Sequence, residues 1–154
     1  TLESVIDPID QRVYPVGRLD QDSRGLLLLT NDGDLTHVIS HPSHGITKEY
    51  EVTVNRPVQQ GDVEKLKSGQ VVLDDRPVHP EQISVRGDHD LNIQLVEGRN
   101  RMIRRMFSQL GYEVQDLFRT RIGPISIEGL SEGGLEELAE EEIDELTALL
   151  ESVE

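Results

Sequence analysis

The sequence predicts an α+β fold built on a largely antiparallel mixed sheet that is flanked by helices. Several segments alternate apolar and polar residues as strands do, and one segment carries an apolar stripe with helical spacing. These segments do not follow one another in the regular order that would favour parallel β-α-β units. The length of 154 residues suits a single core, so we expect residues 1–154 to form one domain.

Residues 48–54 are the clearest predicted strand. Tyr50 and the two valines that follow it at alternate positions fall on one face, while Glu49 and Glu51 fall on the other. Further strands are predicted at residues 13–16, 26–30, 71–73, 83–85, 91–96 and 114–122. Pro15 places the first of these at a sheet edge, because proline cannot donate a hydrogen bond to a neighbouring strand.

Residues 100–110 are the clearest predicted helix. Its apolar side chains recur at i, i+3, i+4 and i+7, at Ile103, Met106, Phe107 and Leu110. Gly111 stands just beyond, where a glycine commonly ends a helix. Further helices are predicted at residues 34–40, around residues 63–66 and at residues 140–150.

The same helix carries a second stripe with the same spacing. It lies two residues out of phase with the apolar stripe, roughly 200° around the helix, and consists of Arg101, Arg104, Arg105 and Ser108. Arg99 adds a further guanidinium just before the first turn. Arginine suits bidentate contacts with phosphate or carboxylate. From periodicity alone, a phosphate-binding face and a merely solvated basic face both remain open.

The net charge of −15 argues at first sight against a nucleic-acid partner. The charge is uneven, however, because residues 128–154 hold eleven acidic residues and no Lys or Arg. That leaves −4 for residues 1–127, and residues 99–121 contain six arginines against two acidic residues. A local positive patch is therefore compatible with the composition, and the acidic end is typical of a solvated helix face.

The composition also excludes several kinds of site. There is no cysteine, no glycine-rich phosphate loop and no apolar stretch of membrane-spanning length. We therefore expect a cytoplasmic protein without disulfides, nucleotide cofactor or membrane partner. His37 and His41 could share a helix face, but Pro42 separates them from His44 and no zinc motif is present, so we expect no metal site.

Asp20 is the most suggestive single carboxylate. It lies between Gly17 and Gly25, in a loop that two predicted strands would hold rigidly, as catalysis requires. Taken alone this signal is weak, because aspartate in a loop is usually a turn or cap residue.

Three motifs together resemble the RsuA-like branch of the rRNA pseudouridine synthases. They are VYPVGRLDQDSRGLLLLTNDGDL at residues 13–35, Lys48-Glu49-Tyr50, and VEGRNRMIRRMFSQLGYEV at residues 96–114. The segment RTRIGPISIEGLSEGG at residues 119–134 is similar to the closing strand of that family. The motifs follow the family order and cover nearly all of the chain. The resemblance implies the pseudouridine synthase catalytic fold and RNA, with rRNA foremost, as the partner.

The resemblance also implies roles for individual residues. Asp20 matches the invariant aspartate that acts at the ribose, and Arg18 the arginine that fills the space left by the flipped nucleotide. Tyr50 matches the tyrosine that packs on the uracil ring, and Arg104 the basic residue that pairs with the aspartate. The implied contacts with the RNA backbone come from Lys48, Arg99, Arg101 and Arg105. No redox step or energy input is needed to move uracil from N1 to C5 attachment, so no cofactor is implied.

Two departures from the family keep alternatives open. Met102 stands where the family usually has Gln, and nothing before residue 13 matches the family's opening strand or its small RNA-binding domain. A non-catalytic RNA-binding module of the same fold is therefore one alternative. A hydrolase that uses Asp20 with Glu97 or Asp22 is another, although no spacing points to such a pair. Without the family match, Tyr50 would be interpreted as a core residue, since Val52 and Val54 share its face.

Overall fold

The computed structural model describes the backbone of residues 14–16 and, with side chains, residues 19–30, 46–99, 101–128, 130 and 142. The helices predicted at residues 34–40 and 140–150 lie outside the described residues. So do Arg18 and the three histidines between residues 37 and 44. No helix in the described part of the chain is long and apolar enough to cross a membrane.

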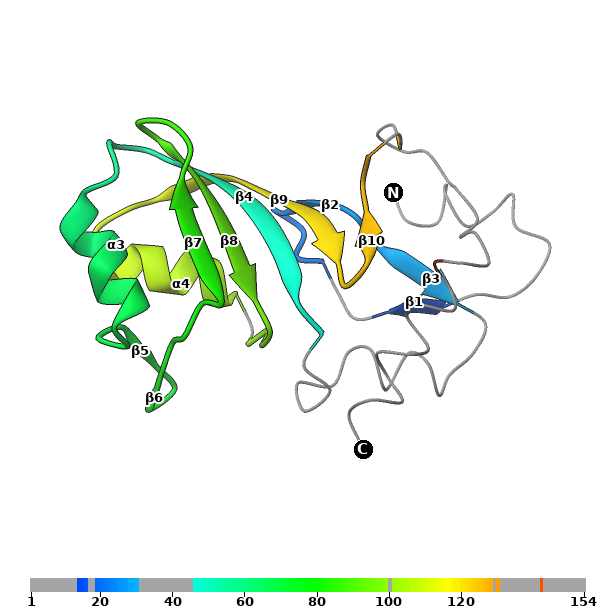
Figure 1. Cartoon of the computed structure of the whole chain (residues 1–154), viewed down its shortest axis with the longest axis horizontal. Coiled ribbons are helices and arrows are strands. Elements are labelled where there is room, and N and C mark those ends of the chain that lie inside the picture. The colour runs from blue at the N-terminus through cyan, green and yellow to red at the C-terminus, as the bar shows by residue number, and fades with distance from the viewer. Residues whose placement is uncertain are drawn as a thin grey trace.

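One twisted sheet organises the molecule (Figure 1). Its path runs β10–β9–β4–β8–β7, and every pair along that path is antiparallel. The strands are β4 (Lys48–Val54), β7 (Gln82–Val85), β8 (Asp90–Leu95), β9 (Val114–Ile122) and β10 (Ile125–Ser126). The bounds of β4 confirm the strand predicted at residues 48–54. The alternating pattern succeeds there because this sheet has one packed face.

Three short strands lie around this path. β2 (Arg24–Gly25) joins β9 in the one parallel pair among the described strands, and this pair makes the sheet mixed. β1 (Tyr14–Val16) pairs antiparallel with β3 (Leu28–Thr30). The predicted strand at residues 26–30 is therefore shorter than expected, because Leu26 turns away to bond with Arg119 of β9.

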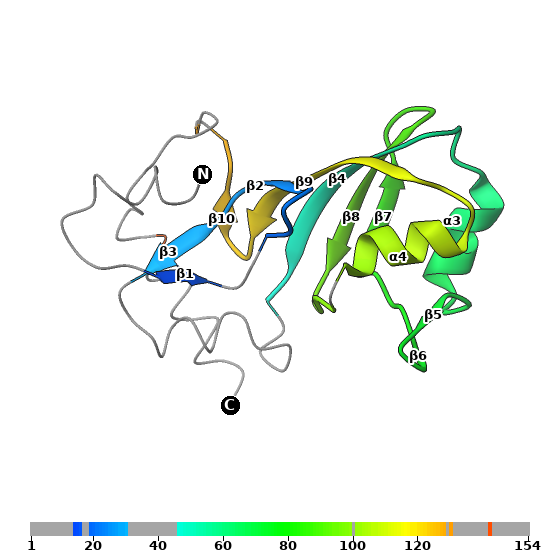
Figure 2. The same ribbon diagram turned by 180° about the vertical axis from the view of Figure 1, so that it is seen from behind.

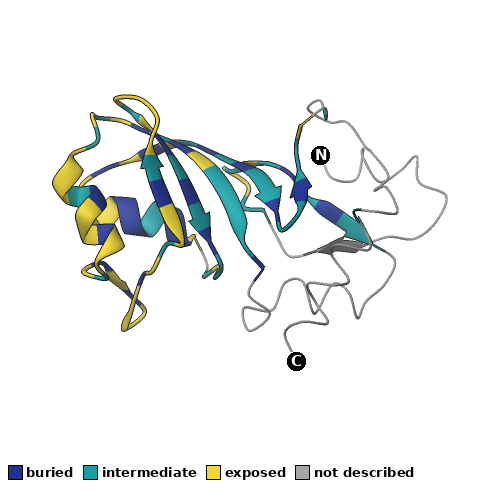
Figure 3. Ribbon diagram, in the orientation of Figure 1, coloured by how far each residue is buried: buried dark blue, intermediate teal, exposed yellow. Residues whose placement is uncertain are grey.

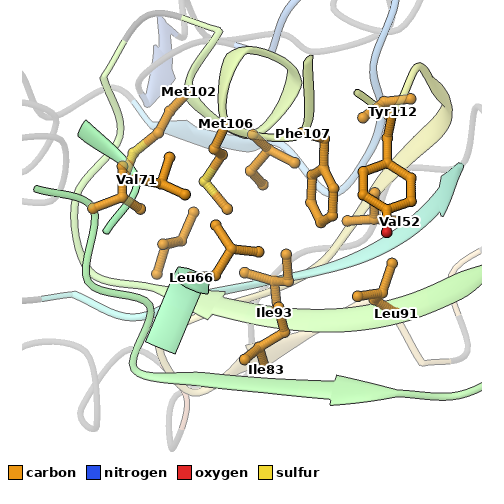
Figure 4. Packing of buried hydrophobic residues seen from close by; sticks show 14 of the residues in the cluster. Val52, Leu66, Val71, Ile83, Leu91, Ile93, Met102, Met106, Phe107 and Tyr112 are labelled. Carbon is orange, nitrogen blue, oxygen red and sulfur yellow. The ribbon is translucent and has the colours of Figure 1, made fainter. Parts of the chain in front are cut away.

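Both described helices pack on one face of the sheet, as the view from behind shows (Figure 2). They are α3 (Gln60–Lys67) and α4 (Met102–Gln109). The predicted apolar stripe of α4 enters the core, and Phe107 and Met106 are almost fully buried. Figure 4 shows these side chains in one cluster with Ile93 and Leu91 of β8. Burial of this face supplies the main driving force for the fold.

Met102 belongs to this core as well, with only 4% of its surface exposed. Its thioether therefore packs among apolar neighbours and stands apart from the arginine stripe. The exposed residues gather on α3, on the hairpin of residues 72–77 and in the turn between β7 and β8 (Figure 3).

Gly111 ends α4 as the sequence predicts. It adopts φ +87°, its N–H donates to the Ser108 carbonyl at 3.0 Å, and the Tyr112 N–H donates to the Phe107 carbonyl at 2.9 Å. This pair of bonds is the Schellman motif, in which a left-handed residue closes the helix. The Tyr112 ring then meets Phe107 edge to face, with centroids 6.0 Å apart.

The hairpin of β5 (Val72–Leu73) and β6 (Arg76–Pro77) has an unfavourable turn sequence. Asp74 and Asp75 occupy its two central positions with φ of 54° and 62°, where type I′ turns favour Asn-Gly.

We expect Asp75→Gly to stabilise the protein by roughly 0.5 kcal/mol in urea denaturation, because glycine adopts this backbone without strain. Asp88→Gly, at an exposed position without positive φ, is the control and should destabilise. Equal destabilisation by both changes would contradict the expectation.

Candidate active site

The loop that carries Asp20 is flanked by paired strands, and β2 at its end joins the main sheet. The Ser23 N–H donates to the Asp20 carbonyl at 2.9 Å and closes a turn over residues 20–23. β1 precedes the loop and β2 ends it, and each is paired with another strand. Asp20 itself is half-buried in this turn.

Asp22 connects the loop to the arginine face of α4. Its two carboxylate oxygens accept hydrogen bonds of 2.9 and 2.8 Å from the two terminal nitrogens of Arg101. The Nε of Arg104 lies 3.3 Å from Asp22 Oδ2, and a second nitrogen of Arg104 donates to the Asp22 carbonyl. These bonds, led by those from Arg101, lower the pKa of Asp22 to about 2, so the carboxylate stays ionised through the neutral range.

Arg105 and Arg99 are also held by the protein. Arg105 makes a bidentate pair with Asp74, at 3.0 Å for both bonds, and this pair lowers the pKa of that carboxyl. Arg99 pairs with Glu97 and donates to three carbonyls of the β5–β6 hairpin. Its side chain is only 9% exposed, whereas those of Arg101 and Arg105 are 46% and 37% exposed.

Tyr50 and Lys48 lie on the packed face of β4. Tyr50 is opposite Arg119 of β9 and Ile93 of β8, and it is half-buried against the core. A Cβ placed on Gly98 would lie 3.9 Å from the Lys48 ammonium, so Lys48 reaches the segment that leads into α4. Burial, and next the positive charge of Arg119, lower the pKa of Lys48.

Arg119 joins the strand of Tyr50 to the segment after the Asp20 loop. It is 4% exposed, its Nε donates to the Leu26 carbonyl at 2.9 Å, and its own carbonyl accepts from the Leu26 N–H at 2.8 Å. In the strand register Gly25 of β2 lies opposite Arg119 of β9, and Arg119 lies opposite Tyr50 of β4. The three residues therefore stand side by side across these strands.

The structure therefore brings the Asp20 loop, the arginine stripe of α4 and the Tyr50 face of β4 into one region. Arg104 contacts Asp22 and donates to the Val114 carbonyl at 3.1 Å, and its pairing with Asp20 stays a prediction. Sequence reasoning missed the parts played by Asp22 and Arg119. Arg119 did leave a signal, because it stands two residues after the inward-facing Leu117 and so places a charge on the packed face.

No group of three or more His, Cys, Asp or Glu side chains suited to a metal ion occurs among the described residues. The acidic side chains of this region instead pair with arginines, as for Asp22, Glu97 and Asp74. The region thus combines carboxylate–guanidinium pairs along α4 with a half-buried tyrosine on β4.

Comparison with known proteins decides the family. Residues 3–109 match the family model described as RNA pseudouridylate synthase. The chain belongs to this family. The resemblance drawn from the motifs is thereby confirmed, and the pseudouridine synthase fold is confirmed by a crystal structure described as that of a pseudouridylate synthase. That structure superposes with a TM-score of 0.82 at 36% identity, over 87% of this chain and 59% of the other.

Two curated relatives agree with this membership of the pseudouridine synthases. An uncharacterized RNA pseudouridine synthase of Mycobacterium leprae (strain TN) is 40% identical over 141 residues, covering 89% of this chain and 55% of the relative. The dual-specificity RNA pseudouridine synthase RluF of Escherichia coli (strain K12) is 36% identical over 152 residues, covering 97% of this chain and 52% of the relative. The chain thus spans about half the length of the curated relatives it matches.

Proposed function

We propose that this chain converts a specific uridine of a structured RNA, with ribosomal RNA foremost, into pseudouridine, and that Asp20 is the essential carboxylate. The observation that carries the proposal is the continuity between the Asp20 loop and Tyr50. The loop ends in β2, whose Gly25 pairs with Arg119, and Arg119 in turn pairs with Tyr50. A loop carboxylate and an aromatic face that are both anchored to β9 suit chemistry on a base that has left its stack.

In this proposal the N1–C1′ bond of uridine breaks, the uracil turns, and C5 bonds to C1′. The proton on C5 is lost and N1 is protonated, so the product is an isomer of the substrate. Asp20, as a carboxylate, attacks the ribose or accepts a proton from it. Tyr50 packs on the uracil ring and helps to remove the C5 proton, and Arg104 supports the carboxylate from α4. Arg18 fills the space that the flipped nucleotide leaves.

The contacts with RNA phosphates divide by exposure. Arg101 and Arg105 are accessible on α4 and are proposed to bind phosphates directly, Arg105 by exchanging Asp74 for the RNA and Arg101 while it keeps its pair with Asp22. Arg99 is largely enclosed by the β5–β6 hairpin, so its part in RNA binding is proposed to be the support of the segment before α4. Lys48 adds positive charge at the buried side of the same segment.

Arg105→Gln is expected to weaken RNA binding and to reduce the slope of log affinity against log salt by about one, because one phosphate contact is lost. The measurement is a fluorescence titration of RNA at several salt concentrations. Arg86→Gln is the matched control, since Arg86 follows β7 at the end of the sheet opposite Lys48. An unchanged slope for Arg105→Gln, or an equal change for Arg86→Gln, would argue against the phosphate contact.

The two alternatives give different products. A binding module leaves uridine unchanged, and a hydrolase releases free uracil. The ion pairs of Asp22 with Arg101 and of Glu97 with Arg99 argue against either carboxylate as a hydrolytic partner of Asp20. We expect nuclease digestion and chromatography of rRNA transcripts treated with the chain to yield pseudouridine in place of one uridine. Free uracil, or unaltered RNA bound by a folded protein, would overturn the proposed function.

A further inference from the structure

Asp22 has a place in the site that the family roles leave unexplained. It stands two residues after Asp20, on the same turn, and its side chain is 48% exposed. It nevertheless makes the bidentate contact with Arg101 and the close approach to Arg104, across more than seventy residues of sequence. Exposed ion pairs contribute little to global stability, so a stability role gives no reason for this arrangement.

The contacts of Asp22 are directional. Two parallel hydrogen bonds between a carboxylate and a guanidinium fix both position and orientation, which a single charge contact does not. Arg104 adds a bond to the backbone carbonyl of Asp22, so the main chain of the turn is held together with the side chain.

The arginine at the other end of this contact is itself in an unusual conformation. Arg101 precedes the first turn of α4 with φ 50° and ψ 33°, the left-handed region that side-chain-bearing residues rarely adopt. Such conformations persist only where surrounding contacts maintain them. The bidentate pair with Asp22 is such a contact.

We propose that Asp22 is a positioning residue, which holds the turn of residues 20–23 against Arg101 and Arg104 and thereby fixes Asp20 for reaction. This inference rests on the proposed function. Asp22 does not touch the substrate in this account. Its removal alters the placement of Asp20, and a displacement of about 1 Å in a reacting group can cost about a hundredfold in rate.

The test compares Asp22→Asn with Asp74→Asn. Asp74 makes the same kind of bidentate pair with the next exposed arginine of α4, at similar distances and with 51% exposure, but on the β5–β6 hairpin. For Asp22→Asn we expect kcat for pseudouridine formation to fall about 10- to 100-fold. The KM should stay the same or fall, because a negative charge beside the RNA is lost. Asp74→Asn should leave kcat nearly unchanged, and Asp22→Glu should recover part of the loss.

A second readout does not depend on activity. Amide hydrogen exchange over residues 19–26 should accelerate in Asp22→Asn and remain unaltered in Asp74→Asn, with little change in melting temperature for either. Unchanged exchange, an unchanged kcat, or equal losses in the two variants would overturn the inference. If the wild type were inactive but amide exchange over the turn still accelerated only in Asp22→Asn, the proposed function would be refuted. The hold of Asp22 on the turn would then still be supported.

Discussion

Asp20→Asn should abolish pseudouridine formation while leaving the fold intact. The amide has nearly the same size and can occupy the same half-buried turn, which is closed by a hydrogen bond to the backbone carbonyl of Asp20. It can neither attack the ribose nor accept a proton, so we expect the single-turnover rate to fall by at least about a thousandfold. The measurement is the rate of pseudouridine formation in rRNA transcripts with enzyme in excess.

The control for this change is Asp88→Asn, which also replaces one carboxylate by an amide, at an exposed residue in the turn between β7 and β8. It should leave the rate unaltered. A folded Asp20→Asn protein, shown by its circular dichroism and melting temperature, that turns over at the wild-type rate would remove Asp20 from the mechanism.

Gly25→Ala should produce the largest loss of stability. A Cβ at this position would lie 2.2 Å from the Arg119 carbonyl oxygen and 2.6 Å from its nitrogen, and Gly25 has φ +120°. Because both neighbours are backbone atoms, β2 must separate from β9. The bonds between Leu26 and Arg119 are then strained or lost. We expect a loss of about 2–4 kcal/mol in urea denaturation, together with loss of activity, since β2 ends the Asp20 loop.

Gly61→Ala is the matched control for Gly25→Ala. A Cβ at Gly61 meets nothing within 4 Å, and Gly61 lies in the first turn of α3. Alanine there should stabilise by roughly 0.5–1 kcal/mol, because it lowers the entropy lost on helix formation. If Gly25→Ala unfolded at the same urea concentration as the wild type, the close approach of β2 and β9 would be contradicted.

Local pattern explains the parts of the fold that the sequence predicts well. The strand at residues 48–54 and the helix that ends before Gly111 each bury one face, and this requirement sets a period of two or of 3.6 residues. The two-residue strand β2 has no such period. Its place beside β9 depends on a contact across more than ninety residues, which no local window contains.

The site was predictable in its residue types and less so in its pairings. The arginine stripe of α4 follows from helical spacing, yet the carboxylates that meet it come from the Asp20 turn and from the β5–β6 hairpin. Those partners depend on tertiary packing. The roles of Asp20, Tyr50 and Arg104 remain predictions that stand on the family motifs and on the geometry around them.

Tritium release from RNA labelled at uracil C5 tests the central proposal most directly, because formation of the C5–C1′ bond transfers that label to water, whereas binding or release of free uracil leaves the label on the ring. Unmodified rRNA transcripts would be incubated with the wild-type chain and with Asp20→Ala. We predict release by the wild type and none by the variant. No release by a folded wild type, or equal release by both proteins, would contradict the proposal that this chain forms pseudouridine through Asp20.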